Sequence, residues 1–223
     1  AGSTLGGFVA GVFIQRYSMG RILRQFGLAT YDFSPTGSGE VILQTRRFVP
    51  SLSRDDYDTE MDSVYEIRHR PIDLKQTALI LIDTWEDHPN DGYLARVKKH
   101  MKTKLKPLLA LARQHGLRVI HSPHELPLVG GREISEMCHA VDGELVVDSG
   151  LLSNAGVELD AYLKAQGVTT LVYAGYAVNW CILIRPTGIL KMKDFGYDVI
   201  LVRDGTLAWE TPESLEGEWA KKM

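Results

Sequence analysis

Short apolar runs alternate with longer segments of helical periodicity over the second two thirds of the chain. The runs lack the alternation of a half-exposed strand, which is typical of strands buried on both faces of a parallel sheet. They are Thr77–Ile82, Leu117–Ile120, Leu145–Val147, Thr169–Tyr173 and Val199–Val202. Helical patterns lie between them, over Tyr93–His115 with a break at Pro107, over Val157–Ala165, and from Cys181 to about Phe195 with a distortion at Pro186. The pattern predicts a three-layer α-β-α fold, of the α/β class, with a mostly parallel central sheet.

The first third of the chain has a different pattern, so we expect an N-terminal arm over residues 1–75 and one α/β domain over 76–223. Apolar residues between Phe8 and Phe26 predict one or two short amphipathic helices, which pack on the domain, on a second subunit or on a membrane surface. Val41–Val49 predicts a strand at an edge of a sheet. Either this strand or a neighbouring molecule is expected to close the central sheet. The charged segment Ser51–Asp73 predicts an irregular segment that is either a solvated arm or an oligomer contact. At the other end, Thr211 followed by Pro212 predicts the start of a last helix.

Composition narrows the class of protein. The 223 residues are 44% hydrophobic and 24% charged, which is ordinary for a globular protein. A net charge of −3 gives no reason to expect nucleic acid or an anionic membrane as a partner. The two cysteines, Cys138 and Cys181, are too few for a disulfide framework, which favours a reducing, cytoplasmic location. No apolar run approaches the roughly 20 residues that span a bilayer.

Polar side chains follow the predicted strands, and right-handed crossovers bring the carboxyl ends of parallel strands to one edge of the sheet. Asp83, His121, Asp148, Cys181 and Asp204 fall at such ends. Cys181 lies after a strand and at the start of a predicted helix, where a helix N-terminus lowers a thiol pKa and favours the nucleophilic thiolate. The alternative interpretation is a buried, inert cysteine.

The stretch Gly175-Tyr176-Ala177-Val178-Asn179-Trp180-Cys181 resembles the isochorismatase-like cysteine hydrolases, which include nicotinamidases and N-carbamoyl amide hydrolases. The resemblance implies a Rossmann-like fold, a homodimer or homotetramer, and cleavage of a C–N bond in a small molecule through a thioester at Cys181. It also implies that Asp83 is the general base, that the Tyr176–Ala177 bond is cis, and that the amides of Trp180 or nearby residues with Cys181 hold the oxyanion. No cofactor is expected.

The chain departs from that family at its third catalytic residue, because Asp148 stands where the family has a Lys. Two carboxylates beside a cysteine would raise its pKa. His88 or His121 could supply the missing positive charge instead. The departure also supports a different function, that of a binding or scaffold protein on a catalytically lapsed hydrolase fold.

By the same resemblance, Trp85, His88, Tyr176 and Trp180 line a pocket for a flat, small substrate, and Ala177 belongs to the site through its peptide. Asn179 is expected to donate to a substrate carbonyl. Arg185 and Arg203 could bind a carboxylate or form structural ion pairs. A metal-assisted hydrolase remains a further alternative, with ligands for zinc or a similar ion drawn from Asp83, Asp87, His88, His121 and His124.

Overall fold

The structure is a computed structural model that describes residues 40–49, 64–124, 133–147, 150 and 153–222. The chain divides into two compact units, residues 1–72 and 73–223, which are taken separately below. The predicted helices before residue 27 lie outside the described residues.

The first unit contributes a two-stranded sheet of β1 (Glu40–Val49) and β2 (Val64–Asp73). β1 is the predicted strand, but it pairs with β2, so the prediction that it closes the central sheet is wrong. The prediction of an irregular segment is also wrong for β2. Its charged residues can be solvated on a two-stranded ribbon, where Glu66 and Arg68 form an exposed ion pair at 2.6 Å. Charge in this segment therefore marked exposure and did not exclude a strand.

The second unit is built on a five-stranded sheet in which every neighbouring pair of strands is parallel, in the order β5-β4-β3-β6-β7. The strands are β3 (Thr77–Ile82), β4 (Arg118–Ser122), β5 (Leu145–Val146), β6 (Thr170–Tyr176) and β7 (Asp198–Leu207). All six residues of β3 are buried, as expected for the centre of a sheet covered on both sides. Ile82 pairs with Ser122 on one side and with Gly175 on the other, so three strands end together.

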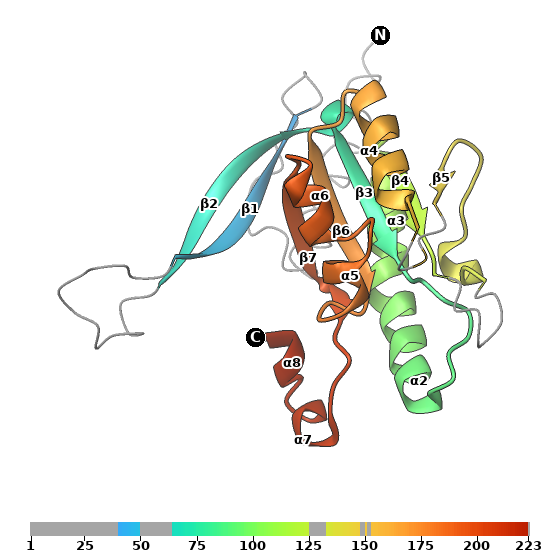
Figure 1. Cartoon of the computed structure of the whole chain (residues 1–223). Helices are drawn as coiled ribbons and strands as arrows, with labels where there is room; N and C mark the ends of the chain where they lie inside the picture. Colours follow the sequence, from blue (N-terminus) through green and yellow to red (C-terminus); the bar gives the residue numbers. More distant parts are fainter. Residues whose placement is uncertain (1–39, 50–63, 125–132, 148–149, 151–152, 223) are drawn as a thin grey trace, which may run out of the picture. The chain divides into compact units, whose positions relative to one another are not determined.

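Helices cover both faces of this sheet, which confirms the predicted three-layer fold (Figure 1). One layer holds α4 (Ala155–Ala165), α5 (Cys181–Ile184) and α6 (Ile189–Asp194), and the other holds α2 (Asp91–His100), the π-helical turn η3 (Met101–Leu105) and α3 (Lys106–Gln114). The remaining short elements are η2 (Leu74–Gln76), η4 (Glu136–Cys138), α7 (Pro212–Leu215) and α8 (Trp219–Lys222). Alternate β3 residues, among them Ile80 and Ile82, form one core cluster with Leu159, Leu163 and Ile182 of the first layer.

The helix boundaries follow local chemistry. Asn90 caps α2 by accepting from the Tyr93 amide at 2.8 Å. The break predicted at Pro107 takes the form of η3, because a proline lacks an N–H and its ring clashes with the preceding turn of a regular helix. Thr211 caps α7 in a capping box with Ser214, as predicted.

Two strands run further than their apolar patterns predicted. β4 includes His121, and β7 continues through Arg203 and Asp204 to Leu207. The β6–β7 pairing shifts register between Tyr173 and Gly175 and then resumes, which carries β7 past its charged residues. Asp204 therefore lies within β7 and not at its carboxyl end.

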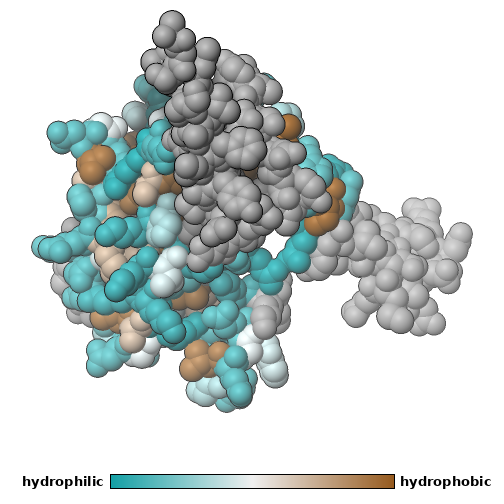
Figure 2. Space-filling model, turned by 180° about the vertical axis from the view of Figure 1, so that it is seen from behind, coloured by the Kyte–Doolittle hydropathy of each residue, from teal (hydrophilic) through white to brown (hydrophobic). Residues whose placement is uncertain are grey.

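No helix within the described residues is both long and apolar enough to cross a membrane. On the face shown in Figure 2, the coloured surface is mostly hydrophilic and its apolar residues lie in separate small patches. Single exposed apolar residues of this kind are normal for a protein surface.

Candidate active site

The turn after β6 brings the cysteine to the edge of the sheet. β6 ends at Tyr176, the Tyr176–Ala177 peptide is cis as predicted, and Cys181 begins α5. Gly175 has a φ of +115°, and a Cβ there would lie 2.0 Å from the Ile82 carbonyl oxygen. Only glycine therefore allows β6 to approach the end of β3 this closely. Because Asp83 follows Ile82 directly, this approach brings the two candidate catalytic residues together.

Cys181 and Asp83 meet through a third residue, Arg185. The Arg185 guanidinium forms an ion pair with Asp83 through Nη2, and the same nitrogen lies 3.6 Å from the Cys181 sulfur. Asp83 and Arg185 are both 0% exposed, whereas Cys181 is partly exposed. Asp83 has a φ of +52°, a left-handed conformation that costs free energy and is found most often at functional sites.

The surroundings of Cys181 raise the pKa of its thiol to about 11. Burial is the largest cause, the negative charge of Asp83 is the second, and the positive charge of Arg185 acts in the opposite direction. The prediction of a thiol pKa lowered by a helix N-terminus is therefore wrong. α5 has only four residues, so its dipole is small beside burial and a neighbouring carboxylate. The resting sulfur is a protonated thiol that needs a base.

Two backbone amides can hold an oxyanion in the turn from Gly175 to Cys181, between β6 and α5, which we call the elbow. The Trp180 amide donates to the Ala177 carbonyl at 3.1 Å, so it is engaged within the turn, contrary to the expectation for that residue. Among the described residues, the turn gives the amides of Ala177 and Cys181 no backbone acceptor. These two N–H groups are the donors that the turn leaves available next to the sulfur.

Four aromatic rings contact one another next to this site. The His88 ring centroid lies 5.1 Å from Trp85, 5.2 Å from Tyr93 and 5.3 Å from Trp209. Tyr93 and Trp209 are 4.7 Å apart. Trp85 is fixed by a β-bridge to Ile134. We call Trp85, His88, Tyr93 and Trp209 the ring group; its members follow the carboxyl ends of β3 and β7.

Two predicted substrate contacts have other roles. The Asn179 side-chain amide donates to the Trp209 carbonyl at 3.0 Å and accepts from the Trp209 amide at 2.9 Å, so it is paired with this backbone and not directed at a substrate carbonyl. Tyr176 is fully buried, and its hydroxyl bonds to Nδ1 of His100 at 2.9 Å, so it belongs to the core. Trp180 is 57% exposed beside Cys181 and can still contact a ligand.

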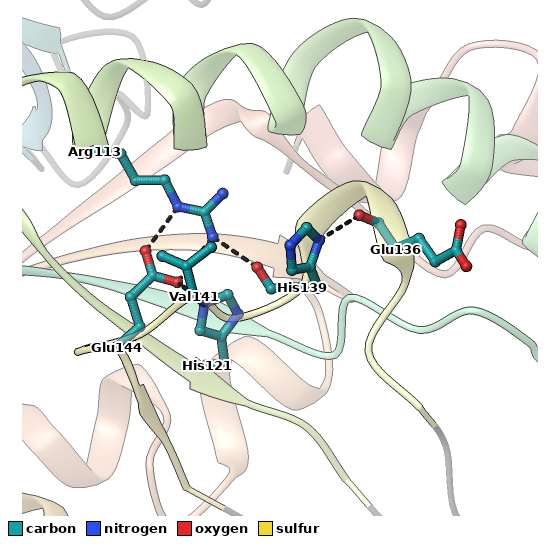
Figure 3. Close-up of polar contacts among 6 residues, drawn as sticks. All are labelled: Arg113, His121, Glu136, His139, Val141 and Glu144. Atoms are coloured by element: carbon teal, nitrogen blue, oxygen red, sulfur yellow. Dashed lines mark hydrogen bonds and ion pairs between the residues drawn. The ribbon is translucent and has the colours of Figure 1, made fainter.

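His121 belongs to a separate polar cluster, shown in Figure 3. Its Nε2 donates to Glu144 at 2.8 Å, and Arg113 binds the two Glu144 oxygens at 2.7 and 2.8 Å. Arg113 also donates to the His139 carbonyl at 2.7 Å. Burial lowers the pKa of His121. Burial acts to raise the pKa of Glu144, but hydrogen bonds from Arg113 and His121 outweigh it and lower the pKa of that carboxyl to about 2. The positive charge beside Cys181 therefore comes from Arg185 and not from His121.

The other candidate residues are dispersed or cannot be placed. Asp148 lies outside the described residues. Nδ1 of His88 accepts from the Asn90 amide at 3.0 Å. Within the described ranges, no three His, Cys, Asp or Glu side chains come together as a metal site, and the proposed ligand Asp87 is exposed.

The sequence pattern missed Arg185, Tyr93 and Trp209. Arg185 was considered only as a carboxylate-binding or structural residue, yet it stands four residues after Cys181, a spacing that puts two side chains on one helix face. Tyr93 was only the first residue of the helix predicted over Tyr93–His115. Trp209 follows the last strand, and the rule that ligands bind beyond strand ends could have identified it.

Comparison with known proteins places this geometry in a family. Residues 77–215 match the model of the isochorismatase domain. The isochorismatase family protein YrdC of Bacillus subtilis (strain 168) is 26% identical over 144 residues, which cover 60% of this chain and 75% of YrdC.

Two crystal structures share the fold. An isochorismatase from Pseudomonas putida KT2440 is 20% identical, and the match covers 67% of this chain and 82% of the P. putida chain with a TM-score of 0.52. A cysteine hydrolase from Pseudomonas syringae pv. phaseolicola 1448A is 22% identical, and the match covers 67% of this chain and 84% of the P. syringae chain with a TM-score of 0.54. Since the family model spans more than half of the residues, the chain belongs to the isochorismatase domain family.

Proposed function

We propose that this protein hydrolyses a C–N bond of a small molecule, in an amide, imide or carbamoyl group, through a thioester at Cys181. The observation that carries the proposal is the shared position of Arg185, whose Nη2 pairs with Asp83 and lies 3.6 Å from the Cys181 sulfur. This arrangement supplies a nucleophile, a carboxylate base and a buried cation.

In the first half of the reaction, the sulfur attacks the substrate carbonyl carbon while its proton passes to the Asp83 carboxylate. The carbonyl oxygen becomes an oxyanion, which the amides of Ala177 and Cys181 stabilise by hydrogen bonds. The tetrahedral intermediate then breaks its C–N bond, and Asp83 returns the proton to the leaving nitrogen. The products of this half are the free amine and an acyl group on sulfur.

In the second half, Asp83 takes a proton from a water molecule, whose oxygen attacks the thioester carbon. The C–S bond breaks, the sulfur regains its proton from Asp83, and the acid leaves. A thiol pKa of about 11 suits a proton that moves during the attack, since the resting sulfur stays neutral and Asp83 stays charged.

Arg185 takes the part that the family assigns to a Lys. Its charge lowers the pKa of Cys181 and favours both the thiolate and the ionised form of Asp83.

The test incubates the protein with a panel of amides, cyclic imides and N-carbamoyl compounds, followed by intact-mass measurement and product detection. We expect turnover of one class, an acyl adduct on Cys181, and loss of both in Cys181→Ala. Cys138→Ala is the matched control, because Cys138 is fully buried and its pKa is raised to about 12. Absence of turnover and of any adduct would favour the lapsed hydrolase that acts as a binding protein.

A further inference from the structure

The turn between α5 and α6 decides where the Arg185 side chain begins. α5 has only four residues, and the backbone leaves the helix at Arg185, where φ is −60° and ψ is 156°. The Gly188 amide then closes the turn by donating to the Arg185 carbonyl at 2.8 Å. A single helical turn is not stable by itself. The position of the guanidinium therefore depends on what holds residues 186–188 in place.

Thr187 anchors this turn in the interior of the protein. It is 0% exposed, and its hydroxyl forms a hydrogen bond with the Ser122 hydroxyl at 2.7 Å. Its carbonyl accepts a second hydrogen bond, from the Tyr173 hydroxyl, at 2.7 Å. α4 also approaches the turn closely, because a Cβ at Gly156 would lie 2.2 Å from the Pro186 carbonyl oxygen. The turn is therefore held by β4, β6 and α4 together.

Ser122 also holds the second charge beside the sulfur. It is the last residue of β4 and is 0% exposed. Its carbonyl accepts from the Asp83 amide at 3.3 Å, while its hydroxyl bonds to Thr187. Asp83 has a left-handed backbone conformation that the surrounding structure must maintain, and this hydrogen bond contributes to it. One residue thus links the backbone of the base to the turn that follows the cation.

The hydroxyl pair suits a role in geometry better than a role in stability. A buried hydrogen bond contributes only modest net stability, and apolar groups of the same shape can often replace it. Unlike an apolar contact, it fixes a distance and a direction. Nη2 of Arg185 contacts two groups at once, since it pairs with Asp83 and lies 3.6 Å from the Cys181 sulfur. A small displacement of the turn would therefore weaken the contact with the sulfur.

We propose that Ser122 and Thr187 are positioning residues for the two charges beside the nucleophile. Ser122 holds Asp83 through its carbonyl, and Thr187 holds the turn that carries Arg185. The hydrogen bond between the two hydroxyls then sets the separation of the base from the cation. The inference rests on the proposed function for its consequence in catalysis, whereas the positioning itself acts on the thiol and can be measured there.

The test measures the rate at which iodoacetamide alkylates Cys181, from pH 7.5 to pH 9.5. Thr187→Val should react about three- to tenfold more slowly than the wild type, because a displaced guanidinium stabilises the thiolate less. Loosening of the fold alone would expose the sulfur and speed the reaction. Ser122→Ala removes the same hydrogen bond from its other side and should give the same slowing. Thr187→Ser keeps the hydroxyl and should restore the wild-type rate.

Thr77→Val is the matched control. Thr77 is 1% exposed, its hydroxyl also donates at 2.7 Å, to the Asp73 carbonyl, and it lies at the amino end of β3, the opposite end from the site. It should melt at a lower temperature than the wild type but alkylate at the wild-type rate.

Three results would overturn the inference: wild-type alkylation in both Thr187→Val and Ser122→Ala, equal slowing in Thr77→Val, or no restoration by Thr187→Ser. Iodoacetamide needs no substrate, so these outcomes are independent of whether an amide is hydrolysed. The proposed function fails separately, if no compound of the amide panel is turned over or forms an adduct on Cys181.

Discussion

A buried carboxylate and a buried guanidinium have the sulfur of Cys181 as a common neighbour. Each charge compensates the other, so the pair can be buried, and removing either side chain takes away this ionic partner of the other. Asp83 raises the pKa of the thiol and Arg185 lowers it, which gives substitutions at the two positions opposite effects on the reactivity of the sulfur. The thiol is thus a direct reporter of both neighbours.

Asp83→Asn should separate reactivity of the thiol from catalysis. Loss of the negative charge lowers the pKa of Cys181, so its alkylation by iodoacetamide at pH 7.5 should be faster than in the wild type. Substrate hydrolysis should fall to background, because no base remains to take the thiol proton. Mass spectrometry of the alkylated protein and a product assay measure the two effects. Slower alkylation in Asp83→Asn would contradict the assigned electrostatics.

Arg185→Met should act in the reverse direction. Alkylation of Cys181 should slow, and the free energy of unfolding should fall by about 3–5 kcal/mol because the buried Asp83 loses the cation that Arg185 places against it. Arg185→Lys is the conservative comparison and should retain part of the reactivity. In the double variant Asp83→Asn, Arg185→Met, denaturant melts should show less destabilisation than the sum of the single changes. Full additivity would mean that the two side chains do not interact.

The elbow between β6 and α5 shows which parts of the site can be predicted from a sequence. Its strand, its glycine and the position of Cys181 follow from local patterns and from the family resemblance. The role of Arg185 does not, because it depends on where α5 stops: a helix continuing to Phe195 was predicted, and the structure interrupts it after Ile184, next to Pro186. The partners of Asn179 and Tyr176 were also missed, since both contacts join segments distant in sequence.

Gly175→Ala tests the elbow as a unit. A methyl group there would lie 2.0 Å from the Ile82 carbonyl oxygen, and its φ of +115° is unfavourable for any residue with a side chain. We expect a loss of more than about 3 kcal/mol in the free energy of unfolding, from strain and from displacement of β6 against β3. Gly150→Ala is the control, because a Cβ at that position meets nothing within 4 Å. Equal denaturant midpoints for the two variants would refute the close approach.

At the scale of the α/β unit, partly buried titratable groups join elements that lie far apart in the sequence. His100 of α2 bonds to Tyr176 of β6 and, through Nε2 at 2.9 Å, to the Asp204 carbonyl of β7. Glu144 joins α3 to β4 through Arg113 and His121, as Figure 3 shows. Both links need one protonation state: a neutral His100 and a charged Glu144. The stability of the unit is therefore coupled to pH.

Acidification should destabilise the unit in two steps. Burial lowers the pKa of His100 from 6.5 to about 4, so the unfolded chain takes up this proton first, and the contribution to stability, complete above pH 6.5, is lost towards pH 4. The pKa of Glu144 falls from 4.5 to about 2, so its contribution is lost between those values. Each proton gives a slope of at most about 1.4 kcal/mol per pH unit.

Denaturant melts from pH 7.5 to pH 3 of two variants separate these steps. His100→Gln, whose amide can still donate to the Asp204 carbonyl, should reduce the slope between pH 6.5 and pH 4. Glu144→Gln should lower stability at neutral pH, because it breaks the ion pair with Arg113, and should reduce the slope only below pH 4.5. If His100→Gln leaves the upper slope unchanged, His100 takes up its proton at the same pH in the folded and unfolded chains, and the link between α2 and the sheet is not what makes the unit sensitive to acid.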